Sequence, residues 1–432
     1  MTKNERYAKS QALLARTEKH IPSASQTFSK SPLQFPRGQS PHFLERGKDG
    51  HVWDVDGNEY VDLMAGLLPV LLGYCDPDID SAIKAQLDKG ISFSLASPLE
   101  NELAELLIDL IPSAEMVKYG KNGTDATSAA VRLARAYTGR DRVIACGYHG
   151  WQDWYIGATT RNKGVPDQVS ELTCKCGYND LDAMHKLFAQ YTDQIACVIL
   201  EPMSGQFPKP GYLEELKEMV NANGAVLIFD EIVTGFRWAN GGAQEKFGVT
   251  PDLSAFGKAM GNGMPISAIV GRADIMAEME EVFMSSTFGG EALSLAASIA
   301  VIDKMKREPV IDKLYETGRK LSDGAGRLIA KHDLDDVMTI GGNDSWKLLA
   351  FHDHPHASKW AVRTLFQVSM LELGVLMTGA HNVMYSHTEE DIAKVLSAYD
   401  QSLAELKEAL KQPGLDDRLP YDIVQPVFAV RN

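Results

Sequence analysis

The sequence lacks any apolar stretch near the roughly 20 residues that a membrane-spanning helix needs. Residues 1–9 are polar and contain no apolar secretory core. Basic residues number 43 against 58 acidic ones, and the net charge of −15 argues against a surface for nucleic acid or anionic membranes. We therefore expect a cytoplasmic protein that binds neither nucleic acid nor membranes.

Cysteine is scarce, with 5 residues among 432. An odd number spread over a long chain is no disulfide framework and fits a reducing compartment. Cys174 and Cys176 have one residue between them and no second pair at zinc spacing, so we interpret them as structural. The three histidines of residues 352–356 are interrupted by Pro355, and we predict no metal site there.

From about residue 97, helical patterns alternate with short apolar runs at 142–146, 195–200 and 225–229. Continuous apolar runs of this length are typical of strands buried on both faces of a parallel sheet covered by helices. The sequence therefore predicts an α/β protein with a mostly parallel central sheet. The expected helices span about 3–20, 99–110, 124–137, 292–306, 309–331 and 389–410.

Two further patterns outline the organisation of the chain. Residues 51–62 alternate in character around an Asp-Gly pair, which predicts a β-hairpin. Residues 336–340 and 346–351 favour strands of a smaller sheet. We expect an N-terminal segment at 1–55 packing with the small domain, a large domain at 56–305 and a small α+β domain at 306–432.

Asp230 and Lys258 suit one kind of chemistry especially well. Asp230 closes an apolar run, and Lys258 follows among small residues and glycines. A lysine can form a Schiff base with an aldehyde cofactor, and a buried carboxylate can hold a protonated pyridine nitrogen. Pyridoxal phosphate (PLP) needs both groups. Taken singly, each residue is equally explained as a strand-ending carboxylate or a surface lysine.

Other segments offer contacts for such a cofactor. Residues 120–124 (Gly-Lys-Asn-Gly-Thr) precede a predicted helix and would present amides and a hydroxyl to an anion, although Asn-Gly-Thr is also a common helix cap. Tyr148 offers an aromatic plane, with core packing as the alternative. Glu201 ends a strand, where open α/β sheets place ligands. Residues 285–290 supply further hydroxyls and amides.

Together these motifs resemble the class III family of PLP-dependent aminotransferases, of fold type I, from about residue 41 to 391. The branch of glutamate-1-semialdehyde aminomutase and its relatives is the most similar. The matching segments are 54–62, 122–126, 130–141, 148–150, 201–202, 230–237, 257–265 and 286–290.

The resemblance implies roles for individual residues. Lys258 would carry the cofactor as an internal aldimine, Asp230 would pair with the pyridine nitrogen, and Tyr148 would stack on the ring. Thr287 would reach the phosphate of the partner subunit, which implies a homodimer with shared active sites. The other cofactor contacts that the resemblance implies are Asn122, Gly123, Thr124, His149 and Glu201.

The chain departs from the aminomutase pattern where substrate would bind. Residues 66–69 read Gly-Leu-Leu-Pro where the aminomutase has a tryptophan, and a glutamate is replaced around residues 379–382. We hypothesise a polar pocket that suits a hydroxylated carbonyl substrate such as a keto-sugar, although each residue is also explained as loop filler. The residues of this hypothetical pocket are Thr27, Lys30, His381 and Asn382.

The leading interpretation is an aminotransferase that moves an amino group from a small-molecule donor to a carbonyl acceptor. The first alternative is an intramolecular amine shift of the aminomutase type. A second is a non-catalytic protein that binds the cofactor, against which the intact Lys258 argues.

Overall fold

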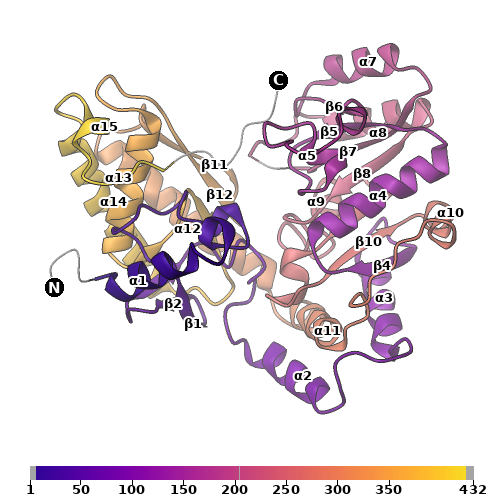
Figure 1. The fold of residues 1–432 in the computed structure, drawn as a ribbon, viewed down its shortest axis with the longest axis horizontal. Helices are drawn as coiled ribbons and strands as arrows, with labels where there is room; N and C mark the ends of the chain where they lie inside the picture. The colour runs from indigo at the N-terminus through magenta and orange to yellow at the C-terminus, as the bar shows by residue number, and fades with distance from the viewer. Residues whose placement is uncertain (1–5, 204, 425–432) are drawn as a thin grey trace. The chain divides into compact units, whose positions relative to one another are not determined.

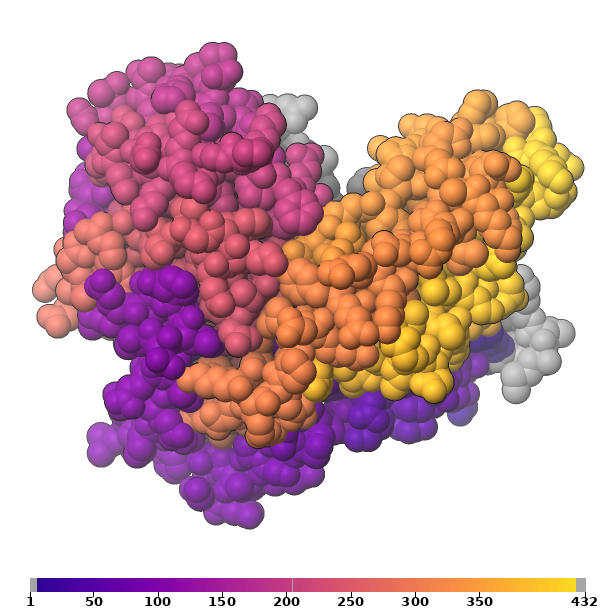
Figure 2. Space-filling model, turned by 180° about the vertical axis from the view of Figure 1, so that it is seen from behind, coloured from indigo at the N-terminus to yellow at the C-terminus, as the bar shows by residue number. Residues whose placement is uncertain are grey.

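The computed structural model describes residues 6–203 and 205–424. These residues divide into two compact units, the first made of 6–76 with 312–424 and the second of 77–311. Colour follows the chain in Figures 1 and 2, so the first unit is indigo and orange to yellow, and the second runs from purple to salmon.

The boundaries between the units differ from those expected at 55/56 and 305/306. Residues 56–76 group with the C-terminal part of the chain. The reason is strand pairing, because β3 (Glu59–Asp62) lies parallel to β13 (Val375–Leu376), with Val61 opposite Val375. Because this pairing satisfies backbone hydrogen bonds of β3, the strand belongs to the same unit as β13.

The second unit is built on a seven-stranded sheet in the order β4-β10-β9-β8-β7-β5-β6. Strand β10 runs antiparallel to both β4 and β9, and the remaining neighbours pair in parallel. The prediction of a mostly parallel sheet is confirmed. The strands are β4 (Met116–Gly120), β5 (Arg142–Cys146), β6 (Thr173–Lys175), β7 (Ile195–Leu200), β8 (Val226–Asp230), β9 (Leu253–Phe256) and β10 (Ser267–Gly271).

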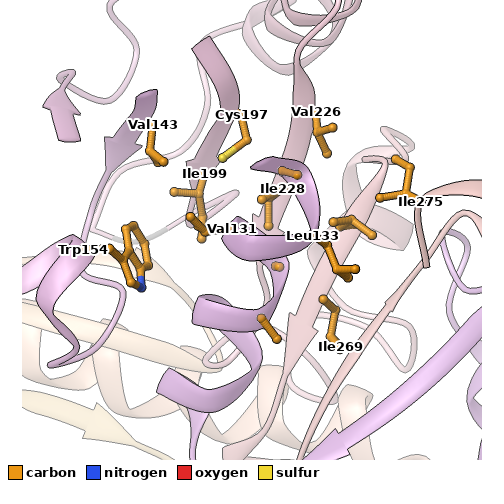
Figure 3. Close-up of a cluster of buried hydrophobic side chains, with 14 of the residues drawn as sticks. Val131, Leu133, Val143, Trp154, Cys197, Ile199, Val226, Ile228, Ile269 and Ile275 are labelled. Carbon is orange, nitrogen blue, oxygen red and sulfur yellow. The ribbon is translucent and has the colours of Figure 1, made fainter. Parts of the chain in front are cut away.

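Helices cover both faces of this sheet. On one face, α4 (Gly123–Thr138) packs Val131 and Leu133 against a cluster that includes Ile199 and Ile228 (Figure 3). The opposite face carries α7 (Leu181–Gln190) and α8 (Tyr212–Ala222). Side chains alternate between faces along a strand, so a central strand covered on both sides must be apolar throughout. All six residues of β7 are buried accordingly.

The remaining helices of the second unit surround this core. The predicted helix at 99–110 is α3 (Pro98–Leu110), which begins at a capping box in which the Glu100 carboxylate accepts the amide of Ser97 at 2.8 Å. The others are α2 (Pro77–Leu87), α5 (Asp153–Ile156), α6 (Asp167–Ser170), α9 (Ala243–Phe247), η3 (Lys258–Gly261), α10 (Ala273–Met276), η4 (Ala277–Glu280) and α11 (Ala292–Arg307).

The first unit contains two small sheets. One has the order β1-β2-β3-β13, from β1 (Leu44–Lys48) and β2 (His51–Asp54). The other has the order β11-β12-β14, from β11 (Met338–Asn343), β12 (Trp346–Phe351) and β14 (Ala380–Asn382). The predicted hairpin at 51–62 is confirmed, since β2 and β3 pair antiparallel. Gly57 in its turn has φ +91°, a conformation that glycine adopts without strain.

Helices complete the first unit. Of the N-terminal helix expected at 3–20, residues 3–5 lie outside the described residues, and in the described part the helix is α1 (Ala8–Thr17). In the part of the chain that the structure describes, no helix is both long and apolar enough to cross a membrane. The other helices are η1 (Pro22–Ala24), η2 (Phe28–Lys30), α12 (Val310–Lys331), α13 (Lys359–Glu372), α14 (Glu389–Ala409) and α15 (Leu415–Arg418).

Candidate active site

Three residues lie at or just after the carboxyl ends of parallel strands of the large sheet. Asp230 is the last residue of β8, Glu201 follows β7, and Gly147 follows β5. The carboxyl ends of parallel strands meet at one edge, where backbone amides and side chains are free to face a ligand. The predicted site therefore lies at this edge.

A buried histidine holds Asp230 in place. Nδ1 of His149 lies 2.7 Å from Oδ2 of Asp230, and the two residues are 2% and 4% exposed. Nε2 of the same ring faces the carbonyl oxygen of Cys146 at 3.1 Å. Because a carbonyl oxygen only accepts, Nε2 donates to it, and a proton between Nδ1 and the carboxylate completes the pair. The amide of Ile232 donates to Oδ1 of Asp230 at 3.1 Å.

Aromatic rings pack around this pair. The His149 ring stacks on Trp154 with centroids 6.3 Å apart and meets Tyr155 edge-on at 5.4 Å. The hydroxyl of Tyr155 donates to the carbonyl of Gly147 at 2.6 Å. The Tyr148 ring packs edge-on against Tyr155, with the ring centroids 5.6 Å apart, and Tyr148 is 49% exposed. The Tyr148 ring is therefore accessible to a ligand.

Lys258 is partly buried, near two carboxylates. Burial lowers the pKa of its amine, while the charges of Asp230 and Glu201 raise it and that of Arg237 lowers it further. Its backbone has φ +38°, an uncommon conformation for a residue with a side chain. Such backbone strain persists only where the surrounding structure imposes it. Both features single out Lys258 from an ordinary surface lysine.

Glu201 shares this environment. Burial first, and then the charge of Asp230, raise the pKa of the Glu201 carboxyl to about 7. The charges of His149 and Lys258 and a hydrogen bond from the backbone of Tyr148 lower this pKa, but by smaller amounts. A Cβ added at Gly147 would lie 2.7 Å from the Glu201 carboxylate, and Gly147 has φ +108°, so a larger residue would displace this carboxylate and strain the backbone.

The N-terminus of α4 forms an anion cradle. Oδ2 of Asp125 accepts the amides of Lys121 and Asn122 at 3.0 and 2.8 Å, and the Gly123 and Thr124 amides follow in the first turn. Oγ1 of Thr124 is buried and has no hydrogen-bond partner in the described residues.

Gly150 forms one wall of this cradle. A Cβ there would stand 2.3 Å from Oγ1 of Thr124. The backbone of Gly150 also has φ +108°, so a larger residue would meet strain as well as a clash.

Two buried ionisable residues were assigned no role in the sequence analysis. Glu231 is fully buried and accepts hydrogen bonds from the amides of Ala243 and Gln244 at 2.8 Å and from the hydroxyl of Thr234. It thereby holds the start of α9, and burial raises the pKa of its carboxyl to about 7. Arg237 is also fully buried, and burial lowers its pKa to about 9. The signal for Glu231 in the sequence was its place beside Asp230 at the end of an apolar run.

The residues expected at the substrate lie in the first unit, and the structure separates one of them from the rest. Nε2 of His381 bonds the hydroxyl of Tyr399 at 2.7 Å, and burial lowers the pKa of this imidazole to about 4. The neighbouring side chain of Asn382 instead donates to the carbonyl of Met64 at 2.8 Å. Successive strand residues point to opposite faces, so His381 and Asn382 do not line one pocket.

The other two expected substrate residues precede or end η2. Thr27 is half-buried, and Lys30 is exposed. The Lys30 charge acts on the pKa of the buried Asp62. Lys30 and Asn382 thus both interact with residues 62–64, at and just after the end of β3. Thr287 belongs to the second unit and is exposed.

The residues at the sheet edge fit PLP. Thr124 offers a buried hydroxyl without a partner, beside a glycine wall. Asp230 offers a fixed carboxylate, Lys258 an amine whose pKa is lowered by burial, and Tyr148 a half-exposed ring. Such a set on a mostly parallel sheet defines a PLP-dependent enzyme of fold type I.

Comparison with known proteins identifies the family. The family model "Aminotransferase class-III" matches residues 34–411. The chain belongs to the class III aminotransferases, and it is a PLP-dependent transaminase that moves an amino group between a donor and a carbonyl substrate.

Three relatives illustrate the similarity. A 3-aminobutyryl-CoA aminotransferase from Cloacimonas acidaminovorans is 36% identical over 420 residues, covering 95% of this chain and 100% of that protein. A glutamate-1-semialdehyde 2,1-aminomutase from Alkaliphilus oremlandii is 36% identical over 439 residues, covering 92% and 99%. The structure of the PLP internal aldimine form of the Sphingopyxis sp. MTA144 FumI protein matches with a TM-score of 0.88 and 26% identity, covering 94% and 98%.

Proposed function

We propose that Lys258 binds the cofactor through its amine and also moves the proton at the reacting carbon of the substrate. The observation that carries this proposal is the partial burial of Lys258 near the fixed carboxylate of Asp230. Only a neutral amine accepts a proton, and burial lowers the pKa of Lys258, which increases the neutral fraction near pH 7.

In this proposal Asp230 keeps the ring nitrogen protonated. Bound PLP supplies an electron sink for the negative charge that develops on the substrate carbon, and a protonated ring is the better sink. Asp230 can serve this role because His149 and the amide of Ile232 fix both of its oxygens. His149 is thus a positioning residue in the proposal.

The remaining cofactor contacts divide between phosphate and ring. Gly123 and Thr124 bind the phosphate through their amides and the Thr124 hydroxyl, at a helix N-terminus that favours negative charge. Asn122 borders the phosphate, although its amide is engaged by Asp125. Tyr148 stacks on the ring, and Glu201 lies beside the reacting amine.

The proposed substrate is a carbonyl compound with hydroxyl groups, such as a keto-sugar. Oδ1 of Asn382 is buried without a hydrogen-bond partner in the described residues, and a substrate hydroxyl would satisfy it. Thr27 and Lys30 add polar groups from the N-terminal segment. His381, which bonds Tyr399, is no longer part of this proposal.

We further propose a homodimer in which Thr287 contacts the phosphate bound by the partner. Phe283 and Phe288, on either side of Thr287, are 82% and 59% exposed in the chain on its own. Exposed large apolar side chains of this kind are typical of an interaction surface. The five free cysteines support our placement of the protein in the reducing cytoplasm.

A covalent test addresses Lys258. Reduction of the PLP-loaded enzyme with borohydride should fix the cofactor to one tryptic peptide, the one that contains Lys258, as read by mass spectrometry. Lys258→Ala should show no fixed cofactor, whereas the exposed Lys186→Ala should behave as wild type. Cofactor fixed to a different lysine in wild type would refute the assignment.

A half-reaction separates the two outcomes of amine transfer. Enzyme mixed with one equivalent of amino donor should release the donor's carbonyl product without any acceptor present. The intramolecular alternative, suggested by the aminomutase relative, would instead convert the substrate with no net release. Candidate substrates for the assay include a keto-sugar with its amine and 3-aminobutyryl-CoA, which the Cloacimonas relative's name supplies.

A further inference from the structure

One cavity of the first unit is lined by none of the residues assigned to PLP. It encloses about 240 Å³ between α13 and the strands of the small sheet. Phe351 of β12 and Gly379 form part of its wall, and Lys359, Trp360 and Arg363 from α13 face it. No acidic residue lines it among the described residues.

Arg363 brings a charge into this cavity that nothing in the described chain neutralises. Nη2 donates to the amide oxygen of Gln34 at 3.0 Å, whereas Nε is buried without a hydrogen-bond partner. No carboxylate of the described residues forms an ion pair with this guanidinium, and burial lowers its pKa. A buried charge left without an opposite charge is costly, so an anion in the cavity would relieve it.

A second cation and an aromatic ring stand beside Arg363. Nζ of Lys359 lies 5.7 Å from the centroid of the Trp360 ring, and Cζ of Arg363 lies 5.8 Å from the same centroid. Both cations therefore gather around one indole. Lys359 is the first residue of α13, where the helix dipole adds positive potential. The nearby Asp353 carboxylate is directed to the Lys359 amide at 2.8 Å.

We propose that this cavity binds a small oxyanion ligand, a carboxylate or a phosphate monoester, through Arg363 and Lys359. A guanidinium is suited to both groups because its fork of donors matches two oxygens at once. The cavity volume of about 240 Å³ limits the size of the ligand, since pockets for drug-sized ligands measure about 300–1,000 Å³. The cavity therefore admits a small organic acid or one end of a larger molecule, with its carbon atoms against Trp360 and Phe351.

Calorimetry on the PLP-loaded enzyme tests the proposal, with the absorbance of bound PLP showing that the cofactor's own phosphate site is filled. Succinate and inorganic phosphate are titrated separately at an ionic strength fixed with chloride. We expect saturable binding of at least one of them. Loss of one charge-assisted contact should weaken binding about tenfold in Arg363→Gln and several-fold in Lys359→Gln.

Lys411→Gln serves as the matched control, since Lys411 is exposed and paired with Glu408 at 2.6 Å. Tighter binding of succinate identifies a carboxylate ligand, and tighter binding of phosphate identifies a phosphate ligand. If Arg363→Gln fails to fold, the exposed Lys359→Gln still gives the answer. Absence of saturable heat with both anions, or wild-type affinity in the Arg363 and Lys359 variants, overturns the proposal. Neither result depends on transaminase activity.

Discussion

Nδ1 of His149 lies 2.7 Å from Oδ2 of Asp230, and both side chains are almost completely buried. The two residues are 81 positions apart in the sequence. This contact links the residue after the aromatic Tyr148 to the carboxylate at the end of β8, so the proposed ring-stacking residue and the proposed partner of the ring nitrogen are held together.

Removing the His149 ring should impair catalysis without removing the cofactor lysine. In His149→Ala the Asp230 carboxylate loses its fixed partner, and we expect kcat to fall about 10- to 100-fold, as is usual when a supporting residue is lost. The absorbance of bound PLP should also titrate at a different pH. His185→Ala is the control, because His185 is exposed on α7. An unchanged spectral titration would contradict the positioning role.

Closing the glycine wall should expel the phosphate. In Gly150→Ala the new Cβ would lie 2.3 Å from Oγ1 of Thr124, so we expect PLP affinity to fall by about tenfold or more in fluorescence titration. Gly164→Ala is a close control, since Gly164 has φ +93° but open space around its Cβ position. Equal affinity loss in both variants would show that backbone strain, and not the cradle, is responsible.

The buried Glu231 should make the apoprotein less stable as pH rises. Burial raises the pKa of Glu231 from 4.5 to about 7, so the folded state holds a proton that the unfolded state has lost between these values. Stability from this group is therefore present below about pH 4.5 and declines towards pH 7, by roughly 3 kcal/mol. Urea unfolding at several pH values should show a flatter profile for Glu231→Gln than for wild type or the exposed Glu218→Gln. The same slope in all three proteins would exclude Glu231 as the source.

The exposed phenylalanines should hold the proposed dimer. Phe283→Glu places a charge where an 82% exposed aromatic ring would be covered by a partner, so sedimentation velocity should show more monomer than in wild type. Weaker PLP binding should accompany the monomer if Thr287 acts across the interface. Leu44→Glu, at a 46% exposed residue of the first unit, is the control. A monomeric wild-type protein would rule out the dimer.

The alternating pattern of the sequence was sufficient for the architecture of the second unit. Strands β5 and β7 have the predicted bounds, and β8 is shifted by one residue to Val226–Asp230. Burial on both faces leaves a continuous apolar run, which is visible without coordinates. The antiparallel β10 was not predicted, because strand direction depends on which neighbours the chain reaches and not on local composition.

The candidate site was predicted unevenly. Lys258, Asp230 and the turn before α4 stay predictions, and they could be proposed from the sequence because their chemistry stands beside recognisable strand and helix ends. The partners of Glu231 were not predictable, since Ala243 and Gln244 donate backbone amides, which every non-proline residue carries. The assignment of His381 to the substrate pocket stays a prediction; in the structure strand alternation turns its ring to Tyr399 on α14.

The sequence by itself determined the fold class and the family, and it singled out Lys258 and Asp230 as candidates for the PLP chemistry, since each depends on residue type and local order along the chain. Only the tertiary structure decided that Asp230 is fixed by His149, that Lys258 lies near two carboxylates, and that Arg363 has no anionic partner among the described residues. Charge and hydrogen bonding depend on which distant groups meet and how much water they exclude, and folding alone sets both.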